Sequence, residues 1–303
     1  MAESWLKGFA PGAAGHDKWE WPRATRGIPN TCPRFPETHM VRQAVLPTRK
    51  RRLGRPARVA AGGMLLALLA LIALLAIRGV NPAGRGNRYV IAPDSIAYGR
   101  SYGEWSAAWE QWADSIPVAV HPLFDNGDCS QGQSGPVWFL GAKMCAEGAN
   151  CAYTGVVRHC SVPAGKALYF PVLDDEDSAL EESLMENPGN PAFEQTAALR
   201  GVVAAQMDAA TSVSCSLDGA LIPDLMAKFR VQSSAFGFTL PGDNLFAALH
   251  GNNSFVAGTY FPGVDDGWFV MLAPLPPGSH VLRLQGGTGG FALDVTYYLH
   301  VQK

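Results

Sequence analysis

Carboxylates are the side chains of this sequence whose grouping could do chemistry. Glu104, Glu110 and Asp114 lie close together, and Glu110 and Asp114 are four residues apart. Two carboxylates on one helix face can serve as general acid and general base in hydrolysis. Nothing around them in the sequence predicts a raised pKa, so we expect solvated side chains. We therefore predict no catalytic residue and keep these three as the candidates.

A second acidic group follows an apolar run. It consists of Asp174, Asp175, Glu176, Asp177, Glu181, Glu182 and Glu186. Hard cations such as Ca²⁺ bind clustered carboxylate oxygens. The Gly and Glu spacing of an EF-hand loop is absent, so the pattern favours a solvated acidic loop. We predict no metal and no cofactor, with Asp174, Asp175 and Asp177 as the candidate ligands.

Aromatic residues are the remaining candidates for ligand contact. β-Sandwiches often bind sugars through surface aromatic side chains, and rings of this kind present a large apolar face. Tyr153, Tyr260, Phe261 and Trp268 are the candidate glycan contacts in this sequence.

The first predicted helix, residues 102–116, must position Glu110 and Asp114. Ser101 is a suitable N-cap, Glu104 completes a capping box, and Pro117 ends the helix. An apolar stripe at helical spacing consists of Trp105, Trp109, Trp112 and Ile116. We interpret this stripe as a core face that packs on a sheet, the alternative being a stacking platform for sugars.

The rest of the chain reads mainly as short strands. Residues 191–210 form a second predicted helix with Asn190 as cap. Asp218-Gly219 predicts a hairpin between residues 212–217 and 220–225. Apolar or alternating runs predict strands at 136–140, 153–157, 166–173, 229–240, 268–273, 281–285 and 291–301. Together they predict a mainly β fold, an antiparallel, jelly-roll-like β-sandwich with two packed helices.

An apolar segment precedes this domain. Residues 59–77, VAAGGMLLALLALIALLAI, carry no charge, and about twenty such residues cross a bilayer core as a helix. Residues 1–58 hold twelve Lys or Arg and four Asp or Glu, whereas residues 79–303 hold eleven and twenty-two. Because basic residues beside an apolar span stay in the cytoplasm, residues 79–303 are predicted to lie outside it. Poor cleavage sites favour an uncleaved signal-anchor over a signal peptide.

Five of the six cysteines follow this segment, on the side where disulfides persist. Their number leaves the pairing open. Short loops close at low cost in chain entropy, which favours Cys145–Cys151 nested within Cys129–Cys160. Cys215 would then be a free, buried thiol.

Four segments together resemble a group of exported bacterial proteins that have no assigned activity. The segments are SYGEWSAAWEQWADSIP (101–117), GQSGPVWFLG (132–141), CSVPAGKALYFPVL (160–173) and DGWFVMLAPLPPGSHVLRLQGG (266–287). They cover most of the chain beyond the apolar segment and nothing before it. The resemblance implies export, and it implies no activity, cofactor or site residue.

The predicted organisation is a basic, disordered cytoplasmic segment (1–58), a transmembrane or signal-anchor helix (59–77), a linker (78–97) and an extracytoplasmic sandwich (98–303). This places a single-pass protein in a bacterial inner membrane with its folded domain in the periplasm, or a secreted domain if the segment is cleaved. The expected partners are the membrane, through residues 59–77, and a glycan or envelope protein, but no nucleic acid.

The predicted function is a non-catalytic binding or structural module of the cell envelope, with a glycan as the candidate ligand. The alternative is a secreted hydrolase whose carboxylates converge only in the fold, drawn from Glu104, Glu110, Asp114 and residues 174–177. A cleft lined by Glu104 or Asp175 with a raised pKa favours the hydrolase. A buried Trp105 face and a smooth surface favour the binding module.

Overall fold

A computed structural model describes residues 87–303. The predicted cytoplasmic segment and apolar helix, and most of the predicted linker, lie outside the described residues. Within residues 87–303, no helix combines the length and the apolar character needed to cross a membrane.

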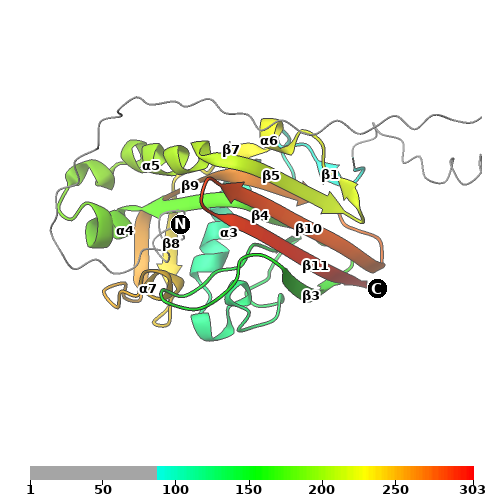
Figure 1. The fold of residues 1–303 in the computed structure, drawn as a ribbon, viewed down its shortest axis with the longest axis horizontal. Helices are drawn as coiled ribbons and strands as arrows, with labels where there is room; N and C mark the ends of the chain where they lie inside the picture. Colours follow the sequence, from blue (N-terminus) through cyan, green and yellow to red (C-terminus); the bar gives the residue numbers. More distant parts are fainter. Residues whose placement is uncertain (1–86) are drawn as a thin grey trace, which may run out of the picture. The chain divides into compact units, whose positions relative to one another are not determined.

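Two β-sheets and several helices make up this part of the chain (Figure 1). The strands are β1 (Val90–Ile91), β2 (Val137–Phe139), β3 (Val156–Pro163), β4 (Ala167–Ser178), β5 (Ala210–Leu217), β6 (Ala220–Leu221), β7 (Arg230–Gln232), β8 (Phe236–Leu240), β9 (Gly258–Leu272), β10 (Gly278–Thr288) and β11 (Ala292–Gln302). The α-helices are α3 (Tyr102–Asp114), α4 (Ala179–Glu181), α5 (Thr196–Asp208), α6 (Leu225–Lys228) and α7 (Leu245–His250).

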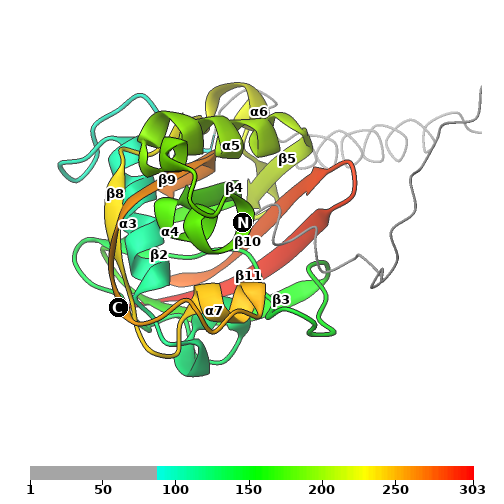
Figure 2. The same ribbon diagram turned by 90° about the vertical axis from the view of Figure 1, so that its left-hand side faces the viewer.

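The first sheet is organised around the long strand β9. One edge of β9 pairs antiparallel with β4, which in turn pairs with β2. The other edge pairs in succession with β8, β7 and β1. α3 contacts β4, β7, β8 and β9, and Figure 2 shows it beside β8 and β9. This sheet and its helix therefore bring together segments that are more than a hundred residues apart.

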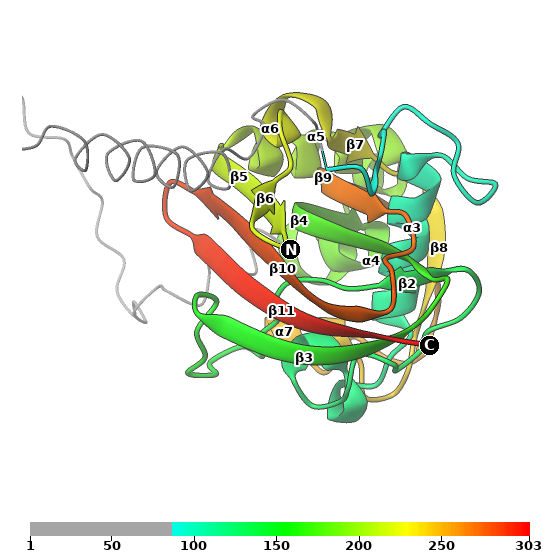
Figure 3. The ribbon, with the colours of Figure 1, turned by 90° about the vertical axis from the view of Figure 1, so that its right-hand side faces the viewer.

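The second sheet has the order β3-β11-β10-β5-β6 and faces the viewer in Figure 3. The predicted strand at 291–301 is confirmed as β11, whose alternate residues are buried: Leu293, Val295, Tyr297, Leu299 and Val301. The hairpin predicted at Asp218-Gly219 is also confirmed, because β5 pairs with β6 and both turn residues have positive φ.

The prediction of purely antiparallel sheets is wrong in two places. β3 pairs parallel with β11, and β2 pairs parallel with β4. Apolar alternation tells which face of a strand is buried but not the direction of its neighbour. Only the hairpin connections, where a short turn fixes the direction, could be assigned from the sequence.

The sheets face each other at Gly286 of β10, where an added Cβ would lie 3.2 Å from the Leu173 Cβ. α5 covers the same face of the first sheet near the far end of β4 and β9, where Leu199 and Val203 pack with Val264. α3 covers the opposite face. The predicted second helix is confirmed only in part, because a 3₁₀ turn capped by Asn190 (Pro191–Glu194) comes before α5.

The capping box of α3 is confirmed. The Ser101 side chain accepts from the Glu104 N–H, and the Glu104 carboxylate accepts from the Ser101 N–H at 2.8 Å. The helix ends at Asp114, two residues before the predicted end. Its tryptophans are buried core residues, and each indole N–H donates to a carbonyl oxygen: Trp105 to Ala97, Trp109 to Leu140 and Trp112 to Gln131.

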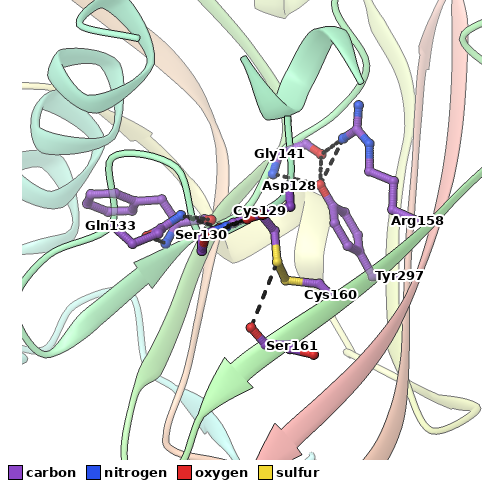
Figure 4. The surroundings of a disulfide bond; sticks show 10 residues. Asp128, Cys129, Ser130, Gln133, Gly141, Arg158, Cys160, Ser161 and Tyr297 are labelled. Atoms are coloured by element: carbon purple, nitrogen blue, oxygen red, sulfur yellow. Dashed lines mark hydrogen bonds between the residues drawn. A yellow bond between two sulfur atoms is a disulfide. The ribbon is translucent and has the colours of Figure 1, made fainter. Parts of the chain in front are cut away.

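Both predicted disulfides are confirmed, and Cys215 is free and buried. Cys129–Cys160 ties the loop before β2 to β3, next to a hydrogen-bond network (Figure 4). In this network Arg158 donates to the Tyr297 hydroxyl at 2.8 Å, and that hydroxyl donates to the Gly141 carbonyl oxygen at 2.7 Å.

Candidate functional site

Five acidic side chains from three elements meet between α3 and the first sheet, and we name them the carboxylate cluster. The cluster consists of Glu110 and Asp114 from α3, Asp174 and Glu176 from β4, and Asp265 from β9. All except Asp174, which is partly buried, have under a tenth of their surface exposed. Acidic residues are almost never fully buried unless they are paired or bind a metal.

The helix contributes its carboxylates because of their spacing. Ser106, Glu110 and Asp114 follow one another at four-residue intervals and therefore share a face of α3. Trp105, Trp109 and Trp112 form the neighbouring face and pack against aromatic residues such as Phe139 and Phe269. The burial of these large rings fixes the rotation of the helix, and this rotation directs Glu110 and Asp114 at the sheet.

A β-bulge decides which acidic residues of β4 face the helix. Pro171 pairs with Phe269 and Leu173 pairs with Trp268, so Val172 is an extra residue in β4. Beyond the bulge, the alternation of side chains is shifted by one position. Asp174 and Glu176 therefore share the α3 face with Asp265, which is directly paired with Glu176.

The cluster contains two sets of three residues whose carboxylate oxygens lie close together. In the first set, one carboxylate oxygen each from Glu110, Asp174 and Asp265 lie within 4.8 Å of one another. In the second set, the same holds for Glu110, Asp114 and Glu176. Ca²⁺ binds oxygen ligands at about 2.3–2.6 Å, so oxygens with this spacing can surround one ion.

Four of the five carboxylates, namely Glu110, Asp114, Asp174 and Asp265, have few compensating partners among residues 87–303. Neither Glu110 oxygen and neither Asp114 oxygen has a hydrogen-bond partner, and none of the salt bridges among residues 87–303 includes Glu110, Asp114, Asp174 or Asp265. Ser106 donates a hydrogen bond to one Asp265 oxygen, while the other oxygen has no partner.

Burial and mutual repulsion raise the pKa values of the cluster. Burial is the main cause for Glu110, followed by the charges of Asp265 and Asp174. Burial also raises the pKa of Asp114 and of Asp265 well above the usual range, and it raises the pKa of Asp174 to about 7. At neutral pH the cluster must therefore hold protons or a cation.

A small pocket adjoins the cluster at the end of β4. Its volume is about 30 Å³, and its lining includes Asp175, Asp177, Glu181 and His250. Such a space holds about one or two water molecules. His250 and Glu181 are hydrogen-bonded at 2.9 Å. Water and small ions fit this pocket, whereas a substrate of ordinary size does not.

Asp266 of β9 and Asp177 of β4 lie next to the cluster but outside it. Asp266 faces away from α3 and pairs with Arg230 at 2.8 Å. Burial first, and then the charges of Glu181 and Glu182, raise the pKa of Asp177 to about 9. Acidic side chains therefore continue beyond the cluster, where Asp266 is paired with Arg230 and Glu181 with His250.

Two expectations about these carboxylates are wrong. Glu110 and Asp114 are fully buried rather than solvated, because the tryptophan stripe turns their face toward the sheet. Asp174, Asp175 and Asp177 lie in strand β4 rather than in a loop, because pairing with β9 continues to Ser178. Glu104 is exposed and caps α3, away from the cluster. Its pKa is lowered by hydrogen bonds from Ser101.

The four aromatic candidates do not form one site. Trp268 is buried and donates to the Met226 carbonyl oxygen, so it is a core residue rather than a surface contact. Tyr260 and Phe261 lie near the start of β9, eight and seven residues before Trp268, which corresponds to roughly 23–26 Å at the ordinary rise of a strand. Tyr153 packs on Phe291 beside the other sheet. Phe261 is 68 % exposed.

Asp265 is the cluster residue that the sequence analysis missed. A signal for it exists in the patterns of β4 and β9. Residues 167–177 change from apolar to acidic, whereas residues 265–272 change from acidic to apolar. Antiparallel pairing aligns these mirrored patterns, as the pairing of Glu176 with Asp265 demonstrates.

Comparisons with known proteins add little. No family model and no curated protein matches the chain. The chain has a likeness to the crystal structure of a cysteine protease inhibitor from Entamoeba histolytica, with 11% sequence identity and a TM-score of 0.19. The match covers 55% of this chain and 96% of that one. At this TM-score the likeness supports no conclusion about fold or function.

Proposed function

We propose that residues 98–303 form an extracytoplasmic module that binds a divalent cation in its carboxylate cluster, and that Ca²⁺ suits the cluster best. The observation that carries the proposal is Glu110, which is completely buried, has no hydrogen-bond partner among residues 87–303 and lies among carboxylates from two strands. A set of anionic oxygen donors is the set that hard cations prefer.

The bound cation has a structural role in this proposal. It joins α3 to β4 and β9 and replaces the repulsion between carboxylates by attraction. The adjoining pocket admits ions and water, which supports a non-catalytic binding or structural module of the cell envelope.

Thermal unfolding of the full-length chain in detergent tests the proposal. After removal of metals by a chelator, Ca²⁺ should raise the midpoint of unfolding, since a ligand at about 100 times its Kd stabilises by about 2.7 kcal/mol. Glu110→Gln should abolish this response. It should also raise the midpoint of the metal-free protein at neutral pH, because glutamine removes a buried carboxyl that must take up a proton on folding.

Glu104→Gln is the matched control. It makes the same change on the same helix at an exposed position, and glutamine can still complete the capping box. This variant should respond to Ca²⁺ as the wild type does. An unchanged midpoint of the wild type in Ca²⁺, Mn²⁺ and Mg²⁺ would refute cation binding.

A glycan is the proposed second ligand of the module. Phe261 supports this proposal, since it is the most exposed of the four aromatic candidates. A glycan array probed with the wild type and with Phe261→Ala tests it. We expect the wild type to bind and the variant to lose binding without any loss of stability. No binding to any glycan would contradict the proposal.

The second candidate function is the secreted hydrolase. It is supported by the raised pKa values of Glu176 and Asp177, two buried carboxylates that line the small pocket at the end of β4. A screen of glycosides and esters with the wild type and Glu110→Gln tests it. Turnover that Glu110→Gln abolishes would favour the hydrolase over the binding module.

We further propose a bacterial inner-membrane location with residues 59–77 as the anchor and the folded domain in the periplasm. The charge difference across this segment, the resemblance to exported proteins and the two disulfides support it. A reporter fused after Lys303 should be active outside the cytoplasm. Activity confined to the cytoplasm would contradict this location.

A further inference from the structure

Glu110 belongs to both sets of closely spaced oxygens in the carboxylate cluster. Asp174 and Asp265 complete the first set, whereas Asp114 and Glu176 complete the second. The five residues do not form a single set with this spacing. Each set therefore defines one position at which three carboxylate oxygens can bind a single ion. Glu110 is the residue that contributes to both positions.

The repeats of the helix and the strand explain why two positions arise. Side chains four residues apart on a helix are separated by about 5–6 Å, which is the relation between Glu110 and Asp114. Side chains two residues apart on one face of a strand are separated by about 6.6 Å, which is the relation between Asp174 and Glu176. The two spacings are nearly equal. Glu110 of α3 therefore lies beside Asp174 of β4, and Asp114 lies beside Glu176 in the same way.

The charge of the cluster also exceeds what one dication neutralises. Five ionised carboxylates carry five negative charges, and four of them, namely Glu110, Asp114, Asp174 and Asp265, take part in no salt bridge within residues 87–303. The nearby Arg230 is already paired with Asp266 and Asp208. Buried charges need compensation, and two dications supply the four positive charges that these four carboxylates require.

We infer that the cluster holds two divalent cations bridged by the Glu110 carboxylate. Glu110, Asp174 and Asp265 bind the first cation, and Glu110, Asp114 and Glu176 bind the second. This inference rests on the proposed function, because it concerns the number of ions and their ligands. A carboxylate that gives one oxygen to each ion holds them about 3.5–4 Å apart, as in known two-metal sites.

Manganese provides a test that needs no assay of activity. Mn²⁺ is a hard dication that takes the same oxygen ligands, and two Mn²⁺ ions at this distance couple magnetically. We expect the full-length chain in detergent to bind two Mn²⁺ per chain in a metal titration. Its electron paramagnetic resonance spectrum should show a coupled pair instead of the six-line signal of an isolated ion.

Three variants assign the ligands. Asp265→Asn should remove the first position and Asp114→Asn the second, so that each variant binds one Mn²⁺ with an uncoupled signal. Glu110→Gln should lower the bound Mn²⁺ to less than one per chain at the concentration that saturates the wild type. Asp294→Asn is the matched control, since Asp294 pairs with Arg283 on the second sheet. It should keep two coupled ions.

The outcomes separate the inference from the proposed function. One uncoupled Mn²⁺ in the wild type would overturn the bridged pair and leave cation binding intact. Two coupled ions in Asp114→Asn would also overturn it, because the second position would then not depend on Asp114. No bound Mn²⁺ or Ca²⁺ in the wild type would refute both.

Discussion

Gly267 of β9 lies directly opposite Asp174 of β4, and a Cβ added to Gly267 would lie 2.6 Å from the Asp174 Cβ. No real Cβ tolerates so short a contact with its neighbour. The absence of a side chain at position 267 is therefore what leaves room for the Asp174 carboxylate on the α3 face of the sheet. The glycine connects the pairing of the strands to the composition of the carboxylate cluster.

Gly267→Ala is expected to destabilise the protein by about 1–3 kcal/mol, the usual cost of added volume in a packed site. It should also weaken Ca²⁺ binding, because Asp174 must move. Urea unfolding followed by tryptophan fluorescence, with and without Ca²⁺, measures both effects.

Gly201→Ala is the control for this substitution. Gly201 lies in α5 with open space around its Cβ position, and alanine should stabilise a helix there by about 0.5–1 kcal/mol. If Gly267→Ala is as stable as the wild type and binds Ca²⁺ as tightly, the close contact between position 267 and Asp174 affects neither stability nor Ca²⁺ binding.

The features that the sequence predicted are those that depend on nearby residues. The capping box of Ser101 and Glu104, the Asp218-Gly219 turn and the alternation in β11 each result from interactions within a few residues or across one hairpin. The nested disulfides follow the same rule, because short loops close easily.

The carboxylate cluster could not be predicted from the same signals. Its formation depends on the bulge at Val172, which directs Asp174 and Glu176 toward α3 instead of Asp175 and Asp177. A bulge of one residue has no mark in the apolar pattern. An acidic run after a strand normally indicates a solvated loop, and only long-range pairing with Asp265 reverses that interpretation.

Removal of the two disulfides should have unequal effects. The chain-entropy model gives roughly 4 kcal/mol for the 31-residue separation of Cys129 and Cys160 and roughly 2 kcal/mol for the six-residue separation of Cys145 and Cys151. Urea unfolding of the two double alanine variants measures the difference. Equal losses would show that loop length does not decide the contribution of these bonds.

His121 should make the protein less stable in acid. Its Nδ1 accepts from the Leu123 N–H at 3.1 Å and its Nε2 donates to the Ala113 carbonyl oxygen at 3.0 Å, so the ring is neutral. Burial, assisted by the charge of Arg158 and opposed by the bond to Ala113, lowers its pKa to about 4. The stabilisation is complete above the unfolded pKa of about 6.5, and it is lost as the pH falls from there toward 4.

The loss attributable to His121 approaches about 3 kcal/mol across that range. Urea unfolding of the wild type and His121→Gln at several pH values from 7.5 to 4 isolates it, because the other groups contribute to both proteins. The free-energy difference between them should shrink as the pH falls. His300→Gln, on the exposed face of β11, is the control. A constant difference for His121→Gln would contradict the prediction.

Ser106 is a positioning residue for the first cation in the proposed pair. It is completely buried on α3 and donates to Asp265, so it orients this carboxylate without being a ligand itself. Loss of such an outer partner typically lowers metal affinity by about 10–100-fold. Calorimetric titration of Ser106→Ala with Ca²⁺ should show that loss for one site and little change for the other.

Ser115→Ala is the control, because the exposed Ser115 donates only to the Trp112 carbonyl oxygen at the end of the same helix. Equal affinities in wild type and Ser106→Ala would show that Asp265 needs no such support, whereas equal weakening of both sites would mean that Ser106 acts through the packing of α3 as a whole.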